Sequence, residues 1–178
     1  MPAAGLSSAG KMLVTTFGLG HMRPASGTWG SMPTVAIAGV LIGFGLRPCG
    51  AGLWEGVVYH AVLLGVLLFF SWVCVAFGDG AEVVFGEKDP SQVVADETAG
   101  QAIPLLALPA AATATPEHAL IALGAAFVAF RVFDILKLWP ANGLQSRSGG
   151  WGILLDDLAA GVQAMVVVQI VLRVMWGS

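Results

Sequence analysis

Two pairs of adjacent acids interrupt otherwise apolar stretches of the sequence. Asp96 and Glu97 form the first pair, and Asp156 and Asp157 form the second. Ionised carboxylates are costly in a strongly apolar segment, and where they occur they usually mark a functional site. Carboxylate oxygens bind hard cations such as Mg²⁺, and carboxyl groups also carry protons in acid–base reactions. The two pairs are therefore the candidate residues that the rest of the chain must position.

The composition is that of a membrane protein. Of the 178 residues, 57% are hydrophobic and only 11% are charged, whereas about a quarter of the residues of an average soluble domain are charged. The length fits one compact bundle, so we expect a single domain over residues 1–178. The net charge of −3 and the scattered basic residues argue against a nucleic-acid partner.

Long apolar segments predict an all-α fold, a polytopic membrane bundle of about four to five spanning or partly re-entrant helices. A bilayer core requires about 20 helical residues, and the second expected segment has this length without a formal charge. The first segment is shorter, so we expect it to be short or partly re-entrant. Pro104 and Pro109 are expected to kink the third. The expected segments are residues 29–46, 57–77, 93–112, 117–138 and 152–176.

The remaining segments are polar or rich in glycine. Residues 1–17 are predicted to be a loose lead-in. The glycines, proline and hydroxyl residues of 18–31 argue against a regular helix and indicate a looped backbone, which is either a connector or part of a binding site. Residues 78–91 are the most polar stretch of the chain and are predicted to form a solvated loop.

Five crossings would place alternate connections on the same side of the membrane. The loops 18–31, 78–92 and 139–150 then share one side with the starts of the third and fifth helices and the end of the fourth. This topology predicts that eight charged residues converge on one membrane face: Asp89, Asp96, Glu97, Arg131, Asp134, Lys137, Asp156 and Asp157.

The distribution of basic residues orients this face. Lysine and arginine are enriched in cytoplasmic connections. The face that carries the acids also carries Lys11, Arg23, Lys88, Arg131, Lys137 and Arg147, against Arg47 and Arg173 on the other side. We therefore expect the acidic face to be cytoplasmic.

The converging residues suit a phosphate ester that is held by a metal ion. Mg²⁺ commonly binds through one or two carboxylates and a substrate phosphate, and it polarises the phosphoryl group and activates water. Two helices begin at this face, and their N-terminal N–H groups favour anions. Thr28 and Ser31, with the backbone amides around them, are candidates for holding phosphate oxygens. Adjacent helical residues point about 100° apart, so we expect one member of each acid pair to lie behind the site or to pair with a cation.

Four segments carry recognisable motifs in a common order. They are Gly-Thr-Trp-Gly-Ser at 27–31, Asp-Pro at 89–90 leading to Val-Val-Ala-Asp-Glu-Thr-Ala-Gly at 93–100, Phe-Arg-Val-Phe-Asp-Ile-Leu-Lys at 130–137, and Gly-Gly-Trp-Gly-Ile-Leu-Leu-Asp-Asp-Leu-Ala-Ala-Gly at 149–161. With these motifs, the chain resembles the phosphatidylglycerophosphatase A family of bacterial membrane phosphatases over about residues 18–165. Ser26 and Leu138 stand where the family usually has proline, which changes the rigidity of two loops but leaves the polar residues in place.

The resemblance implies Mg²⁺-dependent hydrolysis of phosphatidylglycerophosphate to phosphatidylglycerol and inorganic phosphate, at the cytoplasmic face of the bacterial inner membrane. The partners would be this lipid and the membrane, and the oligomeric state stays open. The catalytic candidates are Asp96, Glu97, Asp134, Asp156 and Asp157. The metal candidates are Asp89, Asp96, Glu97 and Asp156. The substrate-binding candidates are Thr28, Ser31, Arg131 and Lys137. The division of the acids between metal ligands and general base stays open.

Each of these residues also has a purely structural interpretation. Asp96 and Glu97 could serve only as helix N-terminal charges, Arg131 and Asp134 as an internal ion pair, and Lys137 as a side chain that reaches the lipid headgroups. The alternative function is a small ion or proton transporter, since intramembrane acids also mark conduction paths. A transporter would place its acids near the bilayer midplane and show repeated halves, whereas these acids are expected at one face.

Overall fold

The computed structural model describes residues 6–48, 52–144 and 149–177, and within these ranges every regular element is a helix. The expected all-α fold is thereby confirmed. Arg147, one of the expected cytoplasmic cations, lies outside the described residues. The elements are α1 Ser8–Val14, η1 Leu19–His21, α2 Ser26–Gly43, α3 Leu53–Phe85, α4 Ala95–Gly100, α5 Ala102–Leu106, η2 Ala110–Thr113, α6 Pro116–Leu136, α7 Ala141–Leu144 and α8 Gly150–Trp176.

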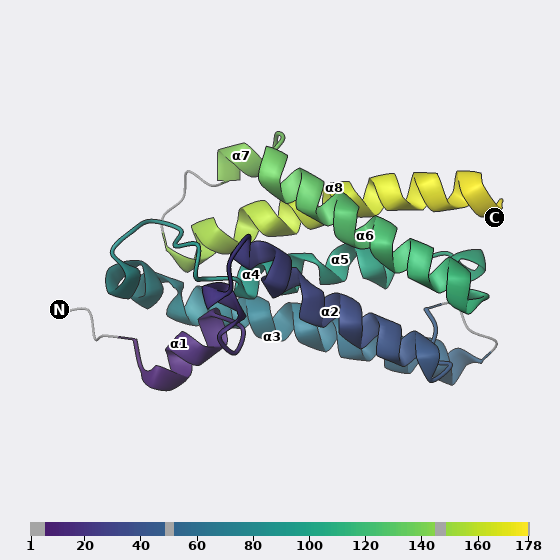
Figure 1. Cartoon of the computed structure of the whole chain (residues 1–178), viewed down its shortest axis with the longest axis horizontal. Coiled ribbons are helices and arrows are strands. Elements are labelled where there is room, and N and C mark those ends of the chain that lie inside the picture. Colours follow the sequence, from purple (N-terminus) through teal and green to yellow (C-terminus); the bar gives the residue numbers. More distant parts are fainter. Residues whose placement is uncertain (1–5, 49–51, 145–148, 178) are drawn as a thin grey trace.

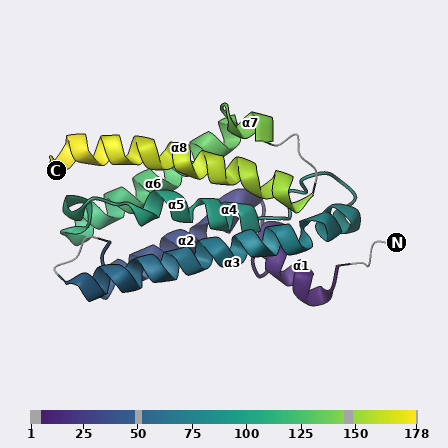
Figure 2. The same ribbon diagram turned by 180° about the vertical axis from the view of Figure 1, so that it is seen from behind.

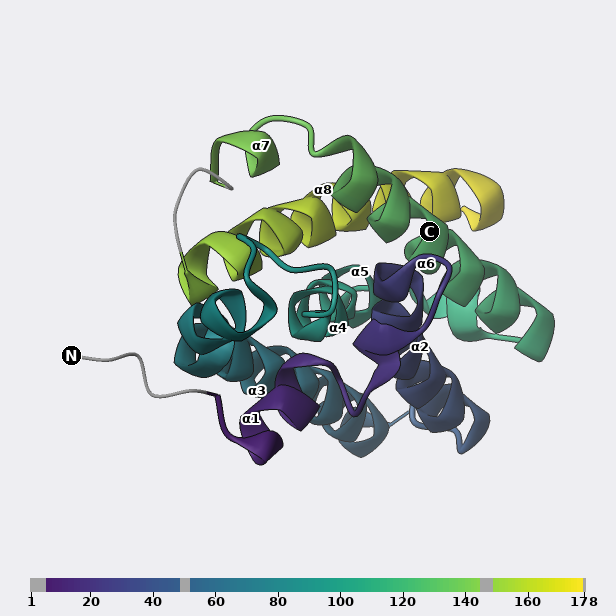
Figure 3. The ribbon, with the colours of Figure 1, turned by 60° about the vertical axis from the view of Figure 1, so that its left-hand side comes forward.

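The long helices of the described chain run along the length of the molecule and enclose two short ones. α2, α3, α6 and α8 lie lengthwise (Figure 1), and the view from behind shows α4 and α5 between α3 and α8 (Figure 2). Seen toward one end, α4 lies among α2, α3 and α8 (Figure 3), and it contacts all three. The acids on α4 are consequently enclosed by these three long helices.

Three helices within the described ranges are long and apolar enough to cross a membrane, namely α3, α6 and α8. This finding agrees with the composition and identifies a membrane protein. The expected third span, 93–112, is wrong as a single helix, because it is divided into α4, α5 and η2. Proline explains part of the division, since it lacks the backbone N–H that a helix needs. Pro104 lies in the first turn of α5, and Pro109 directly precedes η2.

α3 is longer than expected and includes part of the predicted loop 78–91. It ends at Phe85, where Gly86 adopts a left-handed backbone with φ 77° and donates its N–H to the carbonyl of Glu82. The prediction of a loop was wrong here because polar residues are compatible with an exposed helix end. Asp79 has a structural use, since its Oδ1 accepts a hydrogen bond of 2.9 Å from the N–H of Gly150. That bond fastens the start of α8 to α3.

Two other segments that were expected to be irregular are partly helical. In the lead-in 1–17, α1 forms because the Ser7 side chain caps it, accepting a hydrogen bond of 3.0 Å from the N–H of Gly10, and because α1 packs against α3. In the expected loop 18–31, α2 already begins at Ser26. The glycines of this helix allow close packing, as at Gly30, where an added Cβ would press on the side chain of Val94.

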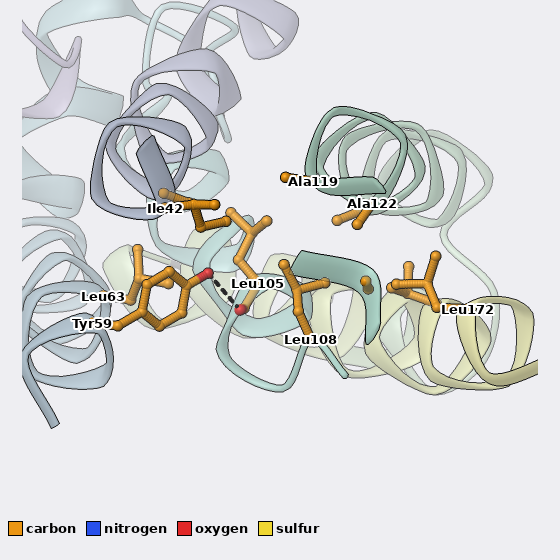
Figure 4. Close-up of a cluster of buried hydrophobic side chains, with 12 residues drawn as sticks. Ile42, Tyr59, Leu63, Leu105, Leu108, Ala119, Ala122 and Leu172 are labelled. Carbon is orange, nitrogen blue, oxygen red and sulfur yellow. Dashed lines mark hydrogen bonds between the residues drawn. The ribbon is translucent and has the colours of Figure 1, made fainter. Parts of the chain in front are cut away.

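One end of the bundle is filled with apolar side chains. Ile42 of α2, Leu105 of α5 and Leu172 of α8 meet there with the ring of Tyr59 (Figure 4). The Tyr59 hydroxyl donates to the carbonyl of Leu105 at 3.0 Å, which satisfies a buried polar group and ties α5 to α3. This packing anchors the short helices at the apolar end, so that α4 is held in place toward the other end.

Candidate active site

Three carboxylates from two helices form an acidic cluster, which we define as Asp96, Glu97 and Asp157. One oxygen from each side chain lies within 4.8 Å of the other two. Asp96 and Asp157 are buried, and Glu97 is half-buried. The expectation that one member of each acid pair lies behind the site or pairs with a cation is met in the first pair by Glu97, whose Oε1 lies 3.9 Å from Arg131 Nη1, although Glu97 also remains in the cluster. The expectation is confirmed for the second pair, in which Asp156 meets a cation instead.

α2 holds α4 in place through close contacts and hydrogen bonds. An added Cβ at Gly27 would overlap Glu97 Oε1, so the glycine lets the start of α2 lie directly against the acidic cluster. The Thr98 hydroxyl donates to the carbonyl of Gly30 at 2.7 Å, and the Thr34 hydroxyl donates to the carbonyl of Thr98 at 2.7 Å. The first motif, at 27–31, thus forms the wall on which α4 rests.

α8 approaches α4 from another side, again at glycines. An added Cβ at Gly100 would lie 2.8 Å from the carbonyl oxygen of Asp157, and one at Gly161 would lie 2.6 Å from the carbonyl oxygen of Gly100. Both distances are too short for a real side chain, so the two backbones can touch only because these residues are glycine. This close approach brings Asp157 to the acids of α4.

Arg131 lies beside the cluster on α6. Its Nη1 is 2.5 Å from Asp134 Oδ2, one helical turn along, and 3.9 Å from Glu97 Oε1. The i, i+3 ion pair between Arg131 and Asp134, which was the structural alternative for these two residues, is present, and Arg131 also lies beside Glu97 of the cluster. Arg131 Nε is buried and has no hydrogen-bond partner within the described part of the chain.

Lys137 forms ion pairs with Asp156 and Asp89. It ends α6 in a left-handed conformation with φ 44°. Its Nζ donates to Asp156 Oδ2 at 2.5 Å and lies 3.7 Å from Asp89 Oδ2. All eight residues that were expected to converge are thus gathered near one end of the bundle. Asp89 and Asp156, two of the expected metal ligands, contact Lys137, whereas the other two, Asp96 and Glu97, lie with Asp157 in the acidic cluster.

The acidic cluster fits a divalent cation. Asp96 Oδ1, Glu97 Oε2 and Asp157 Oδ2 are buried and lack a hydrogen-bond partner among the described residues. Uncompensated buried carboxylate oxygens are costly, whereas a hard cation binds such oxygens directly. Carboxylate-only ligation suits Mg²⁺ or a similar ion and does not suit a thiol-seeking metal.

Burial also changes the proton affinity of the two acids on α4. It raises the pKa of Asp96 well above its ordinary value, and the charge of the adjoining Glu97 raises it further. Burial raises the pKa of Glu97 to about 8, an effect that the hydrogen bond with Asp96 and the charge of Arg131 partly offset. Protons therefore compete with a cation for these oxygens near neutral pH.

The two hydroxyl candidates on α2 have different positions. Ser31 is fully buried, and its hydroxyl donates to the carbonyl of Gly27 at 2.8 Å, within its own helix. Thr28 is half-buried in the first turn of α2. Gln101 was not predicted from the sequence to be a site residue. It is fully buried and follows Glu97 by four residues. That spacing, one helical turn from an acid, is the signal that could have singled it out.

Comparison with known proteins identifies a family and several relatives of the chain. The sequence model of the phosphatidylglycerophosphatase A family matches residues 12–172. A Bacteroides thetaiotaomicron protein with the provisional name phosphatidylinositol-3-phosphatase is 34% identical over 159 residues, 89% of this chain and 91% of that protein. Phosphatidylglycerophosphatase A of Haemophilus influenzae is 32% identical over 164 residues, 88% of this chain and 85% of that protein.

A shorter similarity links the chain to phosphatidylglycerophosphatase A of Escherichia coli, with 40% identity over 78 residues, 43% of this chain and 41% of that protein. No solved structure matches the chain. The family match covers most of the chain and includes every residue of the acidic cluster and its flanking cations. The chain belongs to the phosphatidylglycerophosphatase A family and is a phosphoric monoester hydrolase.

Proposed function

We propose that this protein removes the terminal phosphate of phosphatidylglycerophosphate in a Mg²⁺-dependent reaction at the cytoplasmic face of the bacterial inner membrane. The observation that carries the proposal is the acidic cluster. Its three members present buried oxygens without partners in the described chain, and they lie within 4.8 Å of one another in a lipid phosphatase family.

Asp96, Glu97 and Asp157 would hold the ion. Bound there, Mg²⁺ would polarise the phosphoryl group and lower the pKa of a water molecule. Arg131 lies against Glu97, and its buried Nε–H, which has no partner in the described chain, suits a phosphoryl oxygen. Asp134 keeps the guanidinium in that orientation through the 2.5 Å ion pair.

Lys137 contributes a second positive charge near the cluster. Asp156 and Asp89 hold its ammonium group between α6, α8 and the loop before α4. A phosphate group that carries two negative charges would be attracted by Lys137 and Arg131 together. Such fixed charges stabilise developing negative charge because they need no reorganisation during the reaction.

The geometry also suits a substrate that stays in the membrane. α3, α6 and α8 are the candidate spans, and the acidic cluster lies near the end of the bundle where α6 ends and α8 begins. A headgroup at the membrane surface would reach that end while its acyl chains remain in the bilayer. The excess of basic residues at the same end supports the cytoplasmic orientation.

The relatives support a phosphomonoester substrate and oppose the transporter alternative. Their names, phosphatidylglycerophosphatase A and phosphatidylinositol-3-phosphatase, both describe removal of a phosphate from a phospholipid headgroup. A transporter would need its acids along a path through the bilayer, whereas the described acids of the site gather near one end of the bundle.

Phosphate release tests the proposal. Purified protein in detergent would be given phosphatidylglycerophosphate or phosphatidylinositol 3-phosphate, first with EDTA and then with excess Mg²⁺. We expect Mg²⁺-dependent release, faster from phosphatidylglycerophosphate, that is lost in Asp96→Asn. Equal release in EDTA, or full activity of folded Asp96→Asn, would reject the proposed mechanism. Faster release from phosphatidylinositol 3-phosphate would reject the proposed substrate.

A further inference from the structure

Gln101 has no place in the mechanism above, although its surroundings demand a partner. Its side chain is fully buried, with 0% of its surface exposed. Neither its amide nitrogen nor its amide oxygen has a hydrogen-bond partner within the described part of the chain. Buried polar side chains are almost always hydrogen-bonded, and an unpaired one is costly. A molecule bound beside Gln101 would supply the missing hydrogen-bond partners.

The helix places this amide beside the acidic cluster. The backbone N–H of Gln101 donates to the carbonyl of Glu97 at 3.0 Å, so the backbone is helical up to this point. Residues four apart lie on the same helix face, which here is the face where Glu97 meets Arg131 and Gly27. Gln101 therefore lies one helical turn beyond Glu97, on the side of α4 that carries Glu97.

The unpaired polar groups in and next to the acidic cluster include both hydrogen-bond donors and acceptors. Carboxylate oxygens of the cluster are acceptors, Arg131 Nε–H is a donor, and Gln101 offers one of each. A hydrated cation with a phosphate group provides the complementary set, because its water molecules donate and its phosphate oxygens accept. A cation alone would satisfy the carboxylates but would leave the amide NH₂ group of Gln101 unpaired.

We propose that Gln101 is a positioning residue of the loaded site. Its NH₂ group donates to a phosphoryl oxygen, and its amide oxygen accepts a hydrogen bond from a water molecule of the cation. The inference rests on the proposed function, since it assumes that a cation and a phosphate group bind at the acidic cluster. Gln101 then finds its partners only when both are present.

The test replaces Gln101 with methionine, which has a similar length and volume but cannot donate a hydrogen bond. In the metal-free state, Gln101→Met should unfold at the same temperature as the wild type or at a higher one, because a buried unpaired amide is gone. The increase in unfolding temperature given by MgCl₂ with inorganic phosphate should fall to less than half. The kcat/KM for phosphatidylglycerophosphate should fall about tenfold.

Gln163→Met is the matched control. Gln163 lies on α8, and its Nε2 already donates to the carbonyl of Trp139 at 2.9 Å. Its replacement should leave both the ligand-induced stabilisation and kcat/KM unchanged. Gln101→Leu provides a second variant of similar volume in case Gln101→Met does not fold. It has no hydrogen-bond donor, so the phosphate-dependent part of the stabilisation should disappear.

The outcomes separate the two proposals. A folded Gln101 variant with wild-type stabilisation and wild-type kcat/KM would overturn the role of Gln101. Metal-free Gln101→Met that is clearly less stable than the wild type would also overturn it, because the amide would then have a partner inside the protein. Wild-type protein without Mg²⁺-dependent stabilisation or hydrolysis would instead reject the proposed function itself.

Discussion

Asp156 and Asp157 are adjacent in the sequence but face different partners. Asp157 lies in the acidic cluster, whereas Asp156 Oδ2 accepts a hydrogen bond from Lys137 at 2.5 Å. Each of the two acids also has one buried oxygen without a partner in the described chain. A rotation of about 100° between successive helical residues accounts for the difference. At the scale of residues, the environment therefore places one acid in the proposed cation site and pairs the other with a lysine.

Asp156→Asn should separate these two tasks. The variant keeps the acidic cluster, so Mg²⁺ should still raise its unfolding temperature. It weakens the hold on Lys137, so kcat/KM should fall by about 10- to 100-fold, the range typical of losing a partner that orients a residue of the site. Thermal unfolding and phosphate release measure the two effects. Loss of the Mg²⁺ response would show that Asp156 itself is a ligand.

The pKa of Glu97 predicts how stability depends on pH. Burial raises this pKa from 4.5 to about 8, and the pKa of Asp96 is raised as well. Between pH 4.5 and about pH 8, the folded metal-free protein binds more protons than the unfolded chain. Its free energy of unfolding therefore decreases as the pH rises through this range. Cations bind deprotonated carboxylates, so stabilisation by Mg²⁺ should increase over the same range.

Thermal unfolding in detergent at several pH values, with Mg²⁺ and with EDTA, measures both trends. The direction of the change in stability with pH is informative. If lysine or arginine side chains stabilised the ionised carboxylates, the free energy of unfolding would increase with pH instead. A Mg²⁺-induced stabilisation that stays constant from about pH 5 to pH 8 would contradict the assignment of these two acids as ligands.

At the scale of elements, glycines determine how closely the helices approach the site. Gly27 of α2, Gly100 of α4 and Gly161 of α8 each stand where an added Cβ would overlap a neighbour. At Gly27 the obstructing atoms are the ends of two flexible side chains, Glu97 and Arg131. A substitution there should disturb the site more than the fold.

Gly27→Ala tests this distinction. The added methyl group would lie 2.6 Å from Arg131 Nη1 and would also displace the Glu97 carboxylate. We expect kcat/KM to fall about tenfold while the unfolding temperature of the metal-free protein changes little. Gly43→Ala, on the same helix, is the control, because a Cβ at Gly43 meets no described atom within 4 Å. Equal activity of both variants would show that Gly27 has no part in positioning the site.

The sequence predicted the convergence of the acids but not the form of the elements that carry them. The order of the apolar segments along the chain was enough to predict which segment ends share one side. Asp134, Lys137 and Asp156 could therefore be placed together. The division of 93–112 and the extension of α3 to Phe85 depend on tertiary packing and on the bond between Asp79 and Gly150. The glycines at the start of α2 led to the prediction of a loop. Glycine is common both in turns and where two helices pack closely, and the sequence alone does not distinguish the two.

At the scale of the whole molecule, the polar end and the apolar end have separate roles. α3 has 33 residues, which corresponds to about 50 Å and exceeds the roughly 30 Å of a bilayer core. The end of α3 near Phe85 can therefore extend beyond the membrane beside the site. Since α6 ends and α8 begins there, the active end should face the cytoplasm, where basic residues are enriched.

Cysteine labelling tests this orientation. In a protein whose Cys49 and Cys74 are replaced by serine and alanine, Glu87→Cys should react with a membrane-impermeant maleimide only in inside-out vesicles. Leu53 begins α3 and is 87% exposed, so Leu53→Cys should react only from the opposite side. Reaction of Glu87→Cys in intact cells would reverse the proposed topology.

The acidic cluster as a cation site is the central claim, and direct binding tests it most simply. Mn²⁺, a paramagnetic substitute for Mg²⁺, would be titrated into purified protein and followed by electron paramagnetic resonance, with Asp157→Asn and Asp79→Asn for comparison. We predict that Mn²⁺ binds the wild type and Asp79→Asn, that Mg²⁺ displaces it, and that Asp157→Asn loses the site. Unchanged Mn²⁺ affinity in folded Asp157→Asn would contradict the account.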